Sequence, residues 1–147
     1  MPTVTATPRN DSERNLLELV RHWEETYNTQ VERMITECYA PNADVYFTGG
    51  EAHGHEQFTR LEKAIVGAAP ERRMRVDRVL FAGDDTVVVE AVVLNGADPG
   101  YSSPFCAILT VQGGKIIRDH TYLEPARWPG IEAAADIVTP GGLGKST

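Results

Sequence analysis

Hydrophobic residues in the first half of the chain recur at every third or fourth position, the spacing of a helix that buries one face. One set predicts a helix that is capped by Asp11 or Ser12 and broken at Asn28 and Thr29. Its apolar positions are Leu16, Leu19, Val20, Trp23 and Tyr27. A second set, ended by Pro41, consists of Val31, Met34, Ile35, Cys38 and Tyr39. A third, ended by Gly67 and Pro70, consists of Phe58, Leu61, Ala64 and Ile65.

The rest of the chain is typical of β-strands, because apolar and polar positions alternate between turn-forming residues. A short strand is predicted over residues 44–48, with a turn at Gly49-Gly50. Four longer strands are predicted over residues 74–82, 86–94, 103–111 and 115–123. Two of the connections, residues 83–85 and 112–114, have the composition of hairpin turns.

Helices followed by consecutive antiparallel strands predict an α+β fold, in which one face of a curved sheet packs on the helices. A sheet that curls far enough leaves a cavity between itself and the helices. A chain of 147 residues fits one domain and can bury a core without a metal or a disulfide. Cys38 and Cys106 have no metal-binding spacing, and we interpret both as buried thiols.

Composition narrows the possible partners. The net charge of −7 repels the phosphate backbone, so we expect no nucleic-acid partner. The densest basic stretch is Arg72, Arg73, Arg75 and Arg78, whose spacing suits the exposed face of a strand. No apolar run approaches the roughly 18 residues of a membrane span, so no membrane partner is expected. Residues 1–10 lack the apolar core of a signal peptide, which makes a cytoplasmic location the default.

Two segments resemble the SnoaL-like proteins of the nuclear-transport-factor-2-like superfamily. Residues 37–47 lead into the first predicted strand with the sequence ECYAPNADVYF, and residues 114–124 form the last strand with the sequence GKIIRDHTYLE. The similarity spans about residues 12–125. It implies a cone-shaped fold with a curved antiparallel or mixed sheet on three helices, an internal pocket and a homodimer. The chain then divides into a disordered N-terminus over residues 1–10, a SnoaL-like domain over 11–130 and a C-terminal tail over 131–147.

The superfamily hosts several activities. Two of them do not fit this chain, because the residues at the aligned catalytic positions have the wrong side chains. Aligned with limonene-type epoxide hydrolases, the catalytic positions are occupied by Val45, Phe47, Ala91, Val93 and Thr121. Aligned with ketosteroid isomerases, the places of the base, the acid and the tyrosine fall near Phe47, Ala107 and Trp23. The aspartate of SnoaL-type cyclases falls on Thr121, and the nearest carboxylate on the same face of that strand is Asp119.

The resemblance also implies a mostly apolar pocket wall. Its concave-face positions are Val45, Phe47, Ala91, Val93, Phe105, Ala107 and Leu109, and Trp23 and Tyr27 close it from the first helix. Asp119 and Thr121 are the polar positions. A carboxyl group in an apolar cavity tends to have a raised pKa, which suits acid–base catalysis. The alternative for Asp119 is an exposed strand edge or a pair with an arginine. Tyr27 either donates its hydroxyl to a substrate or packs in the core.

The loop after the first strand carries Glu51, His53 and His55, which together with Glu62 suggest a metal site. The spacing of the glutamates is wrong for one, so a polar loop is favoured. His53 is still a candidate acid or base at the pocket mouth. The hypothesis is therefore a cofactor-free acid–base enzyme, of cyclase, isomerase or dehydratase type, acting on a small hydrophobic metabolite such as a polyketide. Asp119, Tyr27 and His53 are its catalytic candidates. The alternative is a binding or accessory domain without chemistry.

Overall fold

Three α-helices and one mixed β-sheet form the fold of residues 4–5, 7–100 and 102–143, which the computed structural model describes. The helices are α1 (Asp11–Thr29), α2 (Val31–Cys38) and α3 (Gly54–Ala68). The strands are β1 (Val4–Thr5), β2 (Tyr39–His53), β3 (Arg72–Phe81), β4 (Thr86–Asn95), β5 (Ser103–Gln112), β6 (Lys115–Tyr122) and β7 (Thr139–Gly142). Two short 3-10 helices, η1 (Pro125–Arg127) and η2 (Ile131–Ala134), connect β6 to β7. The predicted α+β class is confirmed.

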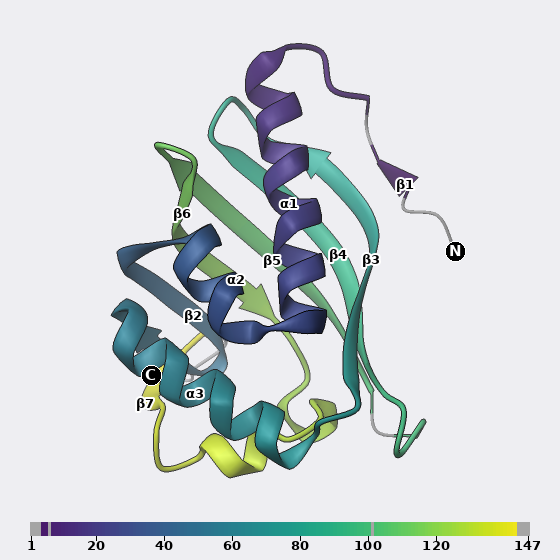
Figure 1. Ribbon diagram of the computed structural model, residues 1–147, viewed down its shortest axis with the longest axis vertical. Coiled ribbons are helices and arrows are strands. Elements are labelled where there is room, and N and C mark those ends of the chain that lie inside the picture. The colour runs from purple at the N-terminus through teal and green to yellow at the C-terminus, as the bar shows by residue number, and fades with distance from the viewer. Residues whose placement is uncertain (1–3, 6, 101, 144–147) are drawn as a thin grey trace.

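The strands lie in the order β1-β3-β4-β5-β6-β2-β7. Hairpins make β3, β4, β5 and β6 antiparallel, whereas β2 runs parallel to β6 and β7 runs antiparallel to β2. All three α-helices cover one face of this curved sheet, and α1 runs lengthwise over its centre (Figure 1). The apolar positions of the helices and of the inner sheet face form one core cluster. The cone is open, because the sheet does not close on itself.

The observed cap of the first helix, Asn10, lies one residue before the nearer of the two predicted caps. The side chain of Asn10 accepts a hydrogen bond from the backbone N–H of Glu13 at 2.9 Å, which satisfies one of the free donors at the helix start. The backbone N–H of Arg9 in turn donates to the Glu13 carboxylate at 3.0 Å. These reciprocal bonds select Asn10, whereas Asp11 and Ser12 lie inside the helix.

Strand β2 is much longer than the predicted strand over residues 44–48. The expected turn at Gly49-Gly50 is wrong, because residues 48–51 continue β2 and pair with β7. A side chain at Gly142 would lie only 2.0 Å from the carbonyl oxygen of Gly50, so the two backbones approach more closely than a side chain allows. Glycine at these positions therefore allows β2 and β7 to approach closely enough to pair. The C-terminal tail predicted over residues 131–147 contributes β7, and residues 144–147 lie outside the described part.

A bulge in β6 sets which of its side chains face inward. Thr110 pairs with Arg118 and Val111 pairs with Ile116, which leaves Ile117 as an extra residue in β6. Strict alternation along the strand predicts Ile116 on the face opposite Asp119, but the bulge brings both onto the inner face, where both are buried. His120 lies on the opposite face, where its ring contacts Tyr46 with the ring centroids 5.2 Å apart.

Two further sequence expectations need correction. The predicted exposed arginine face of β3 holds for Arg73, Arg75 and Arg78, but Arg72 is buried at the start of the strand. Of the two cysteines, Cys38 is fully buried and Cys106 is only partly buried on the outer face. Residues 1–3 and 6 of the predicted disordered N-terminus lie outside the described residues, while Val4 and Thr5 pair with β3 as β1.

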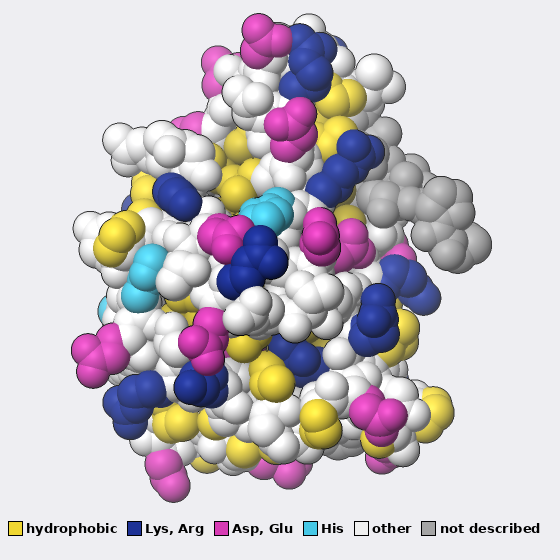
Figure 2. Space-filling model, viewed as in Figure 1, with side chains coloured by type: hydrophobic (Ala, Val, Ile, Leu, Met, Phe, Trp, Pro, Cys, Tyr) yellow, Lys and Arg dark blue, Asp and Glu magenta, His cyan; other side chains and the backbone are white. Residues whose placement is uncertain are grey.

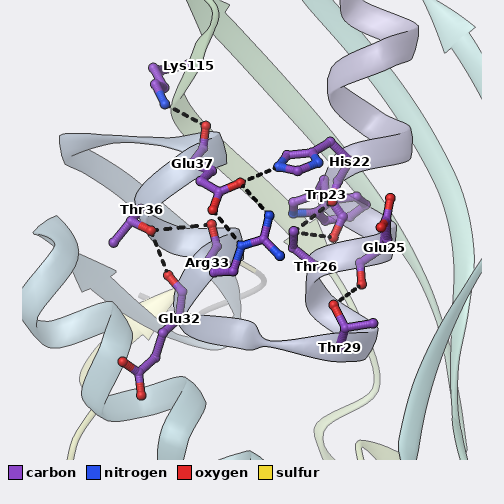
Figure 3. Close-up of polar contacts among 10 residues, drawn as sticks. All are labelled: His22, Trp23, Glu25, Thr26, Thr29, Glu32, Arg33, Thr36, Glu37 and Lys115. Carbon is purple, nitrogen blue, oxygen red and sulfur yellow. Dashed lines mark hydrogen bonds and ion pairs between the residues drawn. The ribbon is translucent and has the colours of Figure 1, made fainter.

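A polar cluster joins α1, α2 and β6 on the helical side of the molecule (Figure 3). The Glu37 carboxylate accepts a hydrogen bond from Arg33 Nε at 2.7 Å and is 2.7 Å from His22 Nε2. The Lys115 ammonium donates to the Glu37 backbone carbonyl at 2.6 Å. Because hydrogen bonds from Arg33 and His22 favour its ionised form, the pKa of Glu37 falls to about 2. The cluster thereby links α1 and α2 on the side away from their apolar faces, which pack into the core.

The helical face of the molecule carries interspersed charges of both signs (Figure 2). Hydrophobic side chains are most frequent at the lower end of this view, around α3 and the 3-10 helices. Of the helices in the described segments, none has the length and apolar character that crossing a membrane requires.

Candidate functional site

A cavity of about 60 Å³ lies between the helices and the inner face of the sheet. Its wall is mostly aromatic and aliphatic. The aromatic residues that line it are Trp23, Tyr27, Tyr39, Phe47, Phe58, Phe105 and Trp128. Three polar side chains also reach it: Glu62 from α3, and Asp119 and Thr121 from β6. The site is therefore a small apolar chamber with two carboxyl groups in its wall.

Asp119 lies in this wall and is 3% exposed, so the carboxyl group faces inward, as the resemblance implied. The bulge at Ile117 and the pairing of Asp119 with Leu109 turn it toward the core. Thr121 donates a hydrogen bond to Oδ1 at 2.5 Å, and Tyr39 donates one to Oδ2 at 2.6 Å. The alternatives of an exposed edge or a pair with an arginine are wrong, because both oxygens bind hydroxyl groups inside the cavity wall.

Opposing effects act on the protonation of Asp119. Burial raises its pKa, because an ionised carboxylate loses hydration, whereas the hydrogen bonds from Thr121 and Tyr39 favour ionisation and lower it. Burial is the larger effect, so the pKa is raised above its ordinary value. A carboxyl group in this state can both release and accept a proton closer to neutral pH than an exposed aspartate.

Tyr39 is a site residue that the sequence pattern did not identify. At four positions after Ile35 it fitted the second helix, but it is the first residue of β2 and its ring enters the cavity wall. Its hydroxyl accepts a hydrogen bond from Trp23 Nε1 at 3.0 Å and donates to Asp119. Burial and the neighbouring Asp119 raise its pKa well above the ordinary value, so Tyr39 stays a donor. Pro41 close behind it was the available signal that the helix had already ended.

A second polar group lies where α1, α3 and β3 meet. The Arg72 guanidinium lies 4.4 Å from the centroid of the Tyr27 ring and donates to the Tyr27 backbone carbonyl at 3.1 Å. Glu62 is buried nearby, and burial raises its pKa to about 7 although the positive charge of Arg72 opposes this. Burial also raises the pKa of Tyr27, so its phenol is neutral. Glu62 was predicted only as a doubtful metal ligand, and Arg72 as a surface residue.

The predicted pocket wall is divided by the packing of α1. Trp23, Tyr27, Val45, Phe47, Phe105 and Thr121 line the cavity. Ala91, Val93, Ala107 and Leu109 are also on the inner face and almost fully buried, but they are not among the cavity-lining residues. Helix α1 crosses the centre of the sheet (Figure 1), and these four residues belong to the hydrophobic core cluster that includes its buried side chains.

His53 lies away from the cavity, at the end of β2 on the molecular surface. Its ring nitrogens are 2.7 Å from Asp44 and 3.1 Å from Glu51, and hydrogen bonds to these carboxylates raise its pKa. The structure thus separates it from Asp119 and Tyr27. The ring of His55 is 2.8 Å from the backbone carbonyl of Tyr39. Among the described residues, no three His, Cys, Asp or Glu side chains are arranged to hold a metal ion.

The sheet order, the three helices on one face and the cavity between them define the class of cone-shaped, nuclear-transport-factor-2-like α+β proteins. The profile of the SnoaL-like domain matches residues 20–119, and the chain belongs to that family. No curated protein sequence matches the chain.

Solved structures share the fold. A protein from Jannaschia sp. CCS1, provisionally named a SnoaL-like polyketide cyclase, superposes with a TM-score of 0.69 at 18% identity over 83% of this chain and 97% of its own. A provisionally named polyketide cyclase from Sinorhizobium meliloti gives 0.62 at 21% identity, over 73% of this chain and 94% of its own. A protein with a ketosteroid isomerase-like fold from Catenulispora acidiphila DSM 44928, solved with trimethylamine, gives a TM-score of 0.63 at 16% identity, over 79% of this chain and 91% of its own. Identities this low show the fold alone.

Proposed function

We propose that this chain binds a small, mostly apolar molecule in its cavity and moves a proton on it with Asp119, without a cofactor. The observation that carries the proposal is a carboxyl group 3% exposed in an apolar cavity wall, with a raised pKa and both oxygens hydrogen-bonded by hydroxyl groups. Membership of the SnoaL-like family supports a small-molecule or cyclase-type role. The two structural relatives named as polyketide cyclases point in the same direction.

The geometry suits proton transfer next to a carbonyl group. As a carboxylate, Asp119 would take a proton from a carbon atom beside the carbonyl, which leaves an enolate, and as the carboxylic acid it would return the proton to another atom of that enolate. Tyr39 and Thr121 would stay bonded to the two carboxylate oxygens and hold their orientation throughout. The apolar wall limits access of water, which strengthens these interactions. Isomerisation, cyclisation and dehydration can all begin with the removal of this proton, and they differ in what the enolate does next.

The size of the cavity restricts the substrate. Sites for drug-sized ligands usually have about 300–1,000 Å³, whereas this cavity has about 60 Å³. A ligand of a few heavy atoms fits this space, and a polycyclic polyketide enters only if the wall moves. We therefore propose a small carbonyl compound, or one end of a larger molecule, as the substrate. The trimethylamine bound by the Catenulispora acidiphila protein is a ligand of comparably small size.

Deuterium exchange into a small ketone tests the proposal without knowledge of the natural substrate. Cyclopentanone is incubated with the protein in deuterated buffer, and NMR follows the loss of the protons beside the carbonyl. We expect the wild-type protein to accelerate exchange above buffer. Replacing Asp119 by Asn should reduce the acceleration by a factor on the order of 10² or more, because an amide cannot serve as the base.

Glu90→Gln is the matched control, since Glu90 is an exposed carboxylate on the outer face and pairs with Arg78 at 3.4 Å. It should leave the exchange rate unchanged. Equal rates for wild type and Asp119→Asn would remove Asp119 from the chemistry.

A binding domain without chemistry is the second candidate. It is favoured by the apolar residues Val45, Phe47, Ala91 and Val93, which occupy the positions of catalytic side chains in the epoxide hydrolases. The chain has two tryptophans, Trp23 and Trp128, and both line the cavity. Their indole N–H signals therefore report binding. Cyclopentanone that shifts these signals but undergoes no accelerated exchange would establish the binding role.

The homodimer and the cytoplasmic location stay predictions. Light scattering of the purified chain measures the oligomeric state. A mass close to twice 16.1 kDa is the expected result.

A further inference from the structure

Glu62 is a buried carboxyl group that the proposed proton transfer does not use. Helix α3 places it on its inner side, 8% exposed and in the cavity wall. Its Oε2 atom has no hydrogen-bond partner among the described residues. A buried carboxylate oxygen without a partner is costly, and native proteins rarely retain one without a role.

Two other buried polar atoms without a partner in the described part of the chain lie on the neighbouring residues. They are the Tyr27 hydroxyl oxygen and Arg72 Nε. Arg72 lies against the Tyr27 ring, 4.4 Å from its centroid, and the charges of Glu62 and Arg72 both act on Tyr27. Tyr27 and Glu62 line the cavity. Two of the three unpartnered atoms thus belong to residues of the cavity wall, on α1 and α3, and Arg72 on β3 lies against one of these residues, Tyr27.

We propose that Glu62 and Tyr27 form a polar subsite of the cavity that binds a hydroxyl or enol group of the ligand, which donates a hydrogen bond to Glu62 and accepts one from Tyr27. This inference rests on the proposed function, because it requires that the cavity takes up a ligand. Asp119 serves the reacting carbon, and the Glu62–Tyr27 subsite orients the molecule through an oxygen.

The charges around Glu62 favour a neutral group. Arg72 on β3 and Asp119 on β6 act on it directly, while Tyr27 on α1 and Tyr39 on β2 are neutral phenols. A cation would be repelled by Arg72, and an anion by the carboxyl groups. A hydroxyl group both donates and accepts, so it satisfies Glu62 in either protonation state. This matters because burial raises the pKa of Glu62 to about 7.

Two probes of similar shape test the subsite: cyclopentanol, which carries the hydroxyl group, and methylcyclopentane, which lacks it. Binding is measured through the indole N–H signals of Trp23 and Trp128. Replacing Glu62 by Leu should weaken the binding of cyclopentanol on the order of tenfold, which is the effect of losing one or two hydrogen bonds in an apolar site. Methylcyclopentane should bind the variant equally well or more tightly. Tyr27→Phe, which removes only a hydroxyl group, should show the same selective loss.

The outcomes separate this inference from the proposed function. If methylcyclopentane and cyclopentanol both fail to bind the wild-type chain, the cavity takes no ligand and both proposals fail. If both bind but Glu62→Leu and Tyr27→Phe weaken neither selectively, only the subsite is wrong. Tighter binding of cyclopentylammonium than of cyclopentanol would also overturn it, since the site would then select a cation.

Thermal unfolding of Glu62→Leu gives an independent test. A carboxyl group kept for ligand binding destabilises the empty fold, so its replacement by a leucine should leave Tm equal or higher. A marked fall in Tm would show that Glu62 stabilises the fold and would contradict the subsite.

Discussion

Tyr39 and Asp119 lie side by side in an apolar wall, where neither can exchange its partner for water. The Tyr39 hydroxyl connects Trp23 Nε1, at 3.0 Å, with the Asp119 carboxylate, at 2.6 Å. Removing the hydroxyl therefore leaves a buried donor and a buried acceptor unpaired. Such groups are expensive, because the desolvation that accompanied folding is no longer compensated.

Replacement of Tyr39 by Phe should lower the free energy of unfolding by about 1–3 kcal/mol. It should also raise the pKa of Asp119 further, since one hydrogen bond that favours the carboxylate is lost. Denaturation by urea measures the first effect. Tyr46→Phe is the control, because Tyr46 is on the outer face and should change stability by less than about 0.5 kcal/mol. Equal effects of the two substitutions would show that the buried connection contributes nothing.

Glu62 should impose a pH dependence on folding. Its pKa is about 7 in the folded chain, above the ordinary value of about 4.3 that applies to the unfolded chain. The folded state therefore binds the proton more tightly, and this contribution to stability is present at low pH and is lost as pH rises toward 7. Glu62→Gln should flatten the fall in stability between pH 5 and pH 7. Superimposable urea midpoints for wild type and variant across this window would contradict the assignment.

At the scale of elements, the Glu37 cluster ties α2 to α1 and to the start of β6 (Figure 3). The apolar faces of these helices point into the core, so the cluster acts at their outer side. Because Arg33 and His22 stabilise the carboxylate, the pKa of Glu37 is lowered to about 2. The contribution of Glu37 to the stability of the fold is therefore present at pH values above the ordinary glutamate pKa and is lost as pH falls toward 2.

Glu37→Gln should weaken the dependence of stability on pH between about pH 4.3 and pH 2 and leave the range above pH 5 nearly unchanged in slope. Circular dichroism during acid titration measures this. Glu32→Gln provides the control from the same helix, since Glu32 is exposed and its carboxylate pairs with a surface lysine, Lys63, at 3.3 Å. Identical acid transitions in wild type and Glu37→Gln would show that the cluster does not couple the elements.

At the scale of the whole molecule, the segment after β6 helps to enclose the cavity. It carries Trp128 and Ile131 into the cavity wall and packs η2 on α3. Gly130 allows this approach, because it adopts a left-handed conformation with φ of 81° and a side chain there would lie 2.5 Å from the carbonyl oxygen of Ile65.

Gly130→Ala should therefore cost about 1–3 kcal/mol more than Gly113→Ala. Gly113 also has a positive φ, of 60°, but has no atoms within 4 Å of the added carbon. Gly113→Ala therefore carries the conformational strain of a positive φ but makes no steric clash. Displacement of Trp128 should shift tryptophan fluorescence to longer wavelength in Gly130→Ala alone. Equal stability of the two variants would show that η2 does not need its close contact with α3.

The inward position of Asp119 was implied by the family resemblance, because alternation along the strand left it open. Local pattern was sufficient to predict the helices and the four long strands. These features depend on which residues are apolar and at what spacing, because each element must bury one face. The cap at Asn10, the bulge at Ile117 and the length of β2 were missed, since they depend on hydrogen-bond partners that the periodicity does not reveal. The pairing of residues 48–51 with a strand some 90 residues later along the chain is one such case.

What the sequence determined by itself is the order of the elements, their buried faces and an apolar wall with one acidic position in β6. Only the tertiary structure decided which polar side chains meet there. Tyr39, Glu62 and Arg72 come from elements far apart in the chain and reach the cavity region because the helices pack on the curved sheet. It also decided that His53 stays outside. The physical reason is that burial and hydrogen-bond partners are properties of the packed chain, and these set both the protonation of a group and the molecule that it can meet.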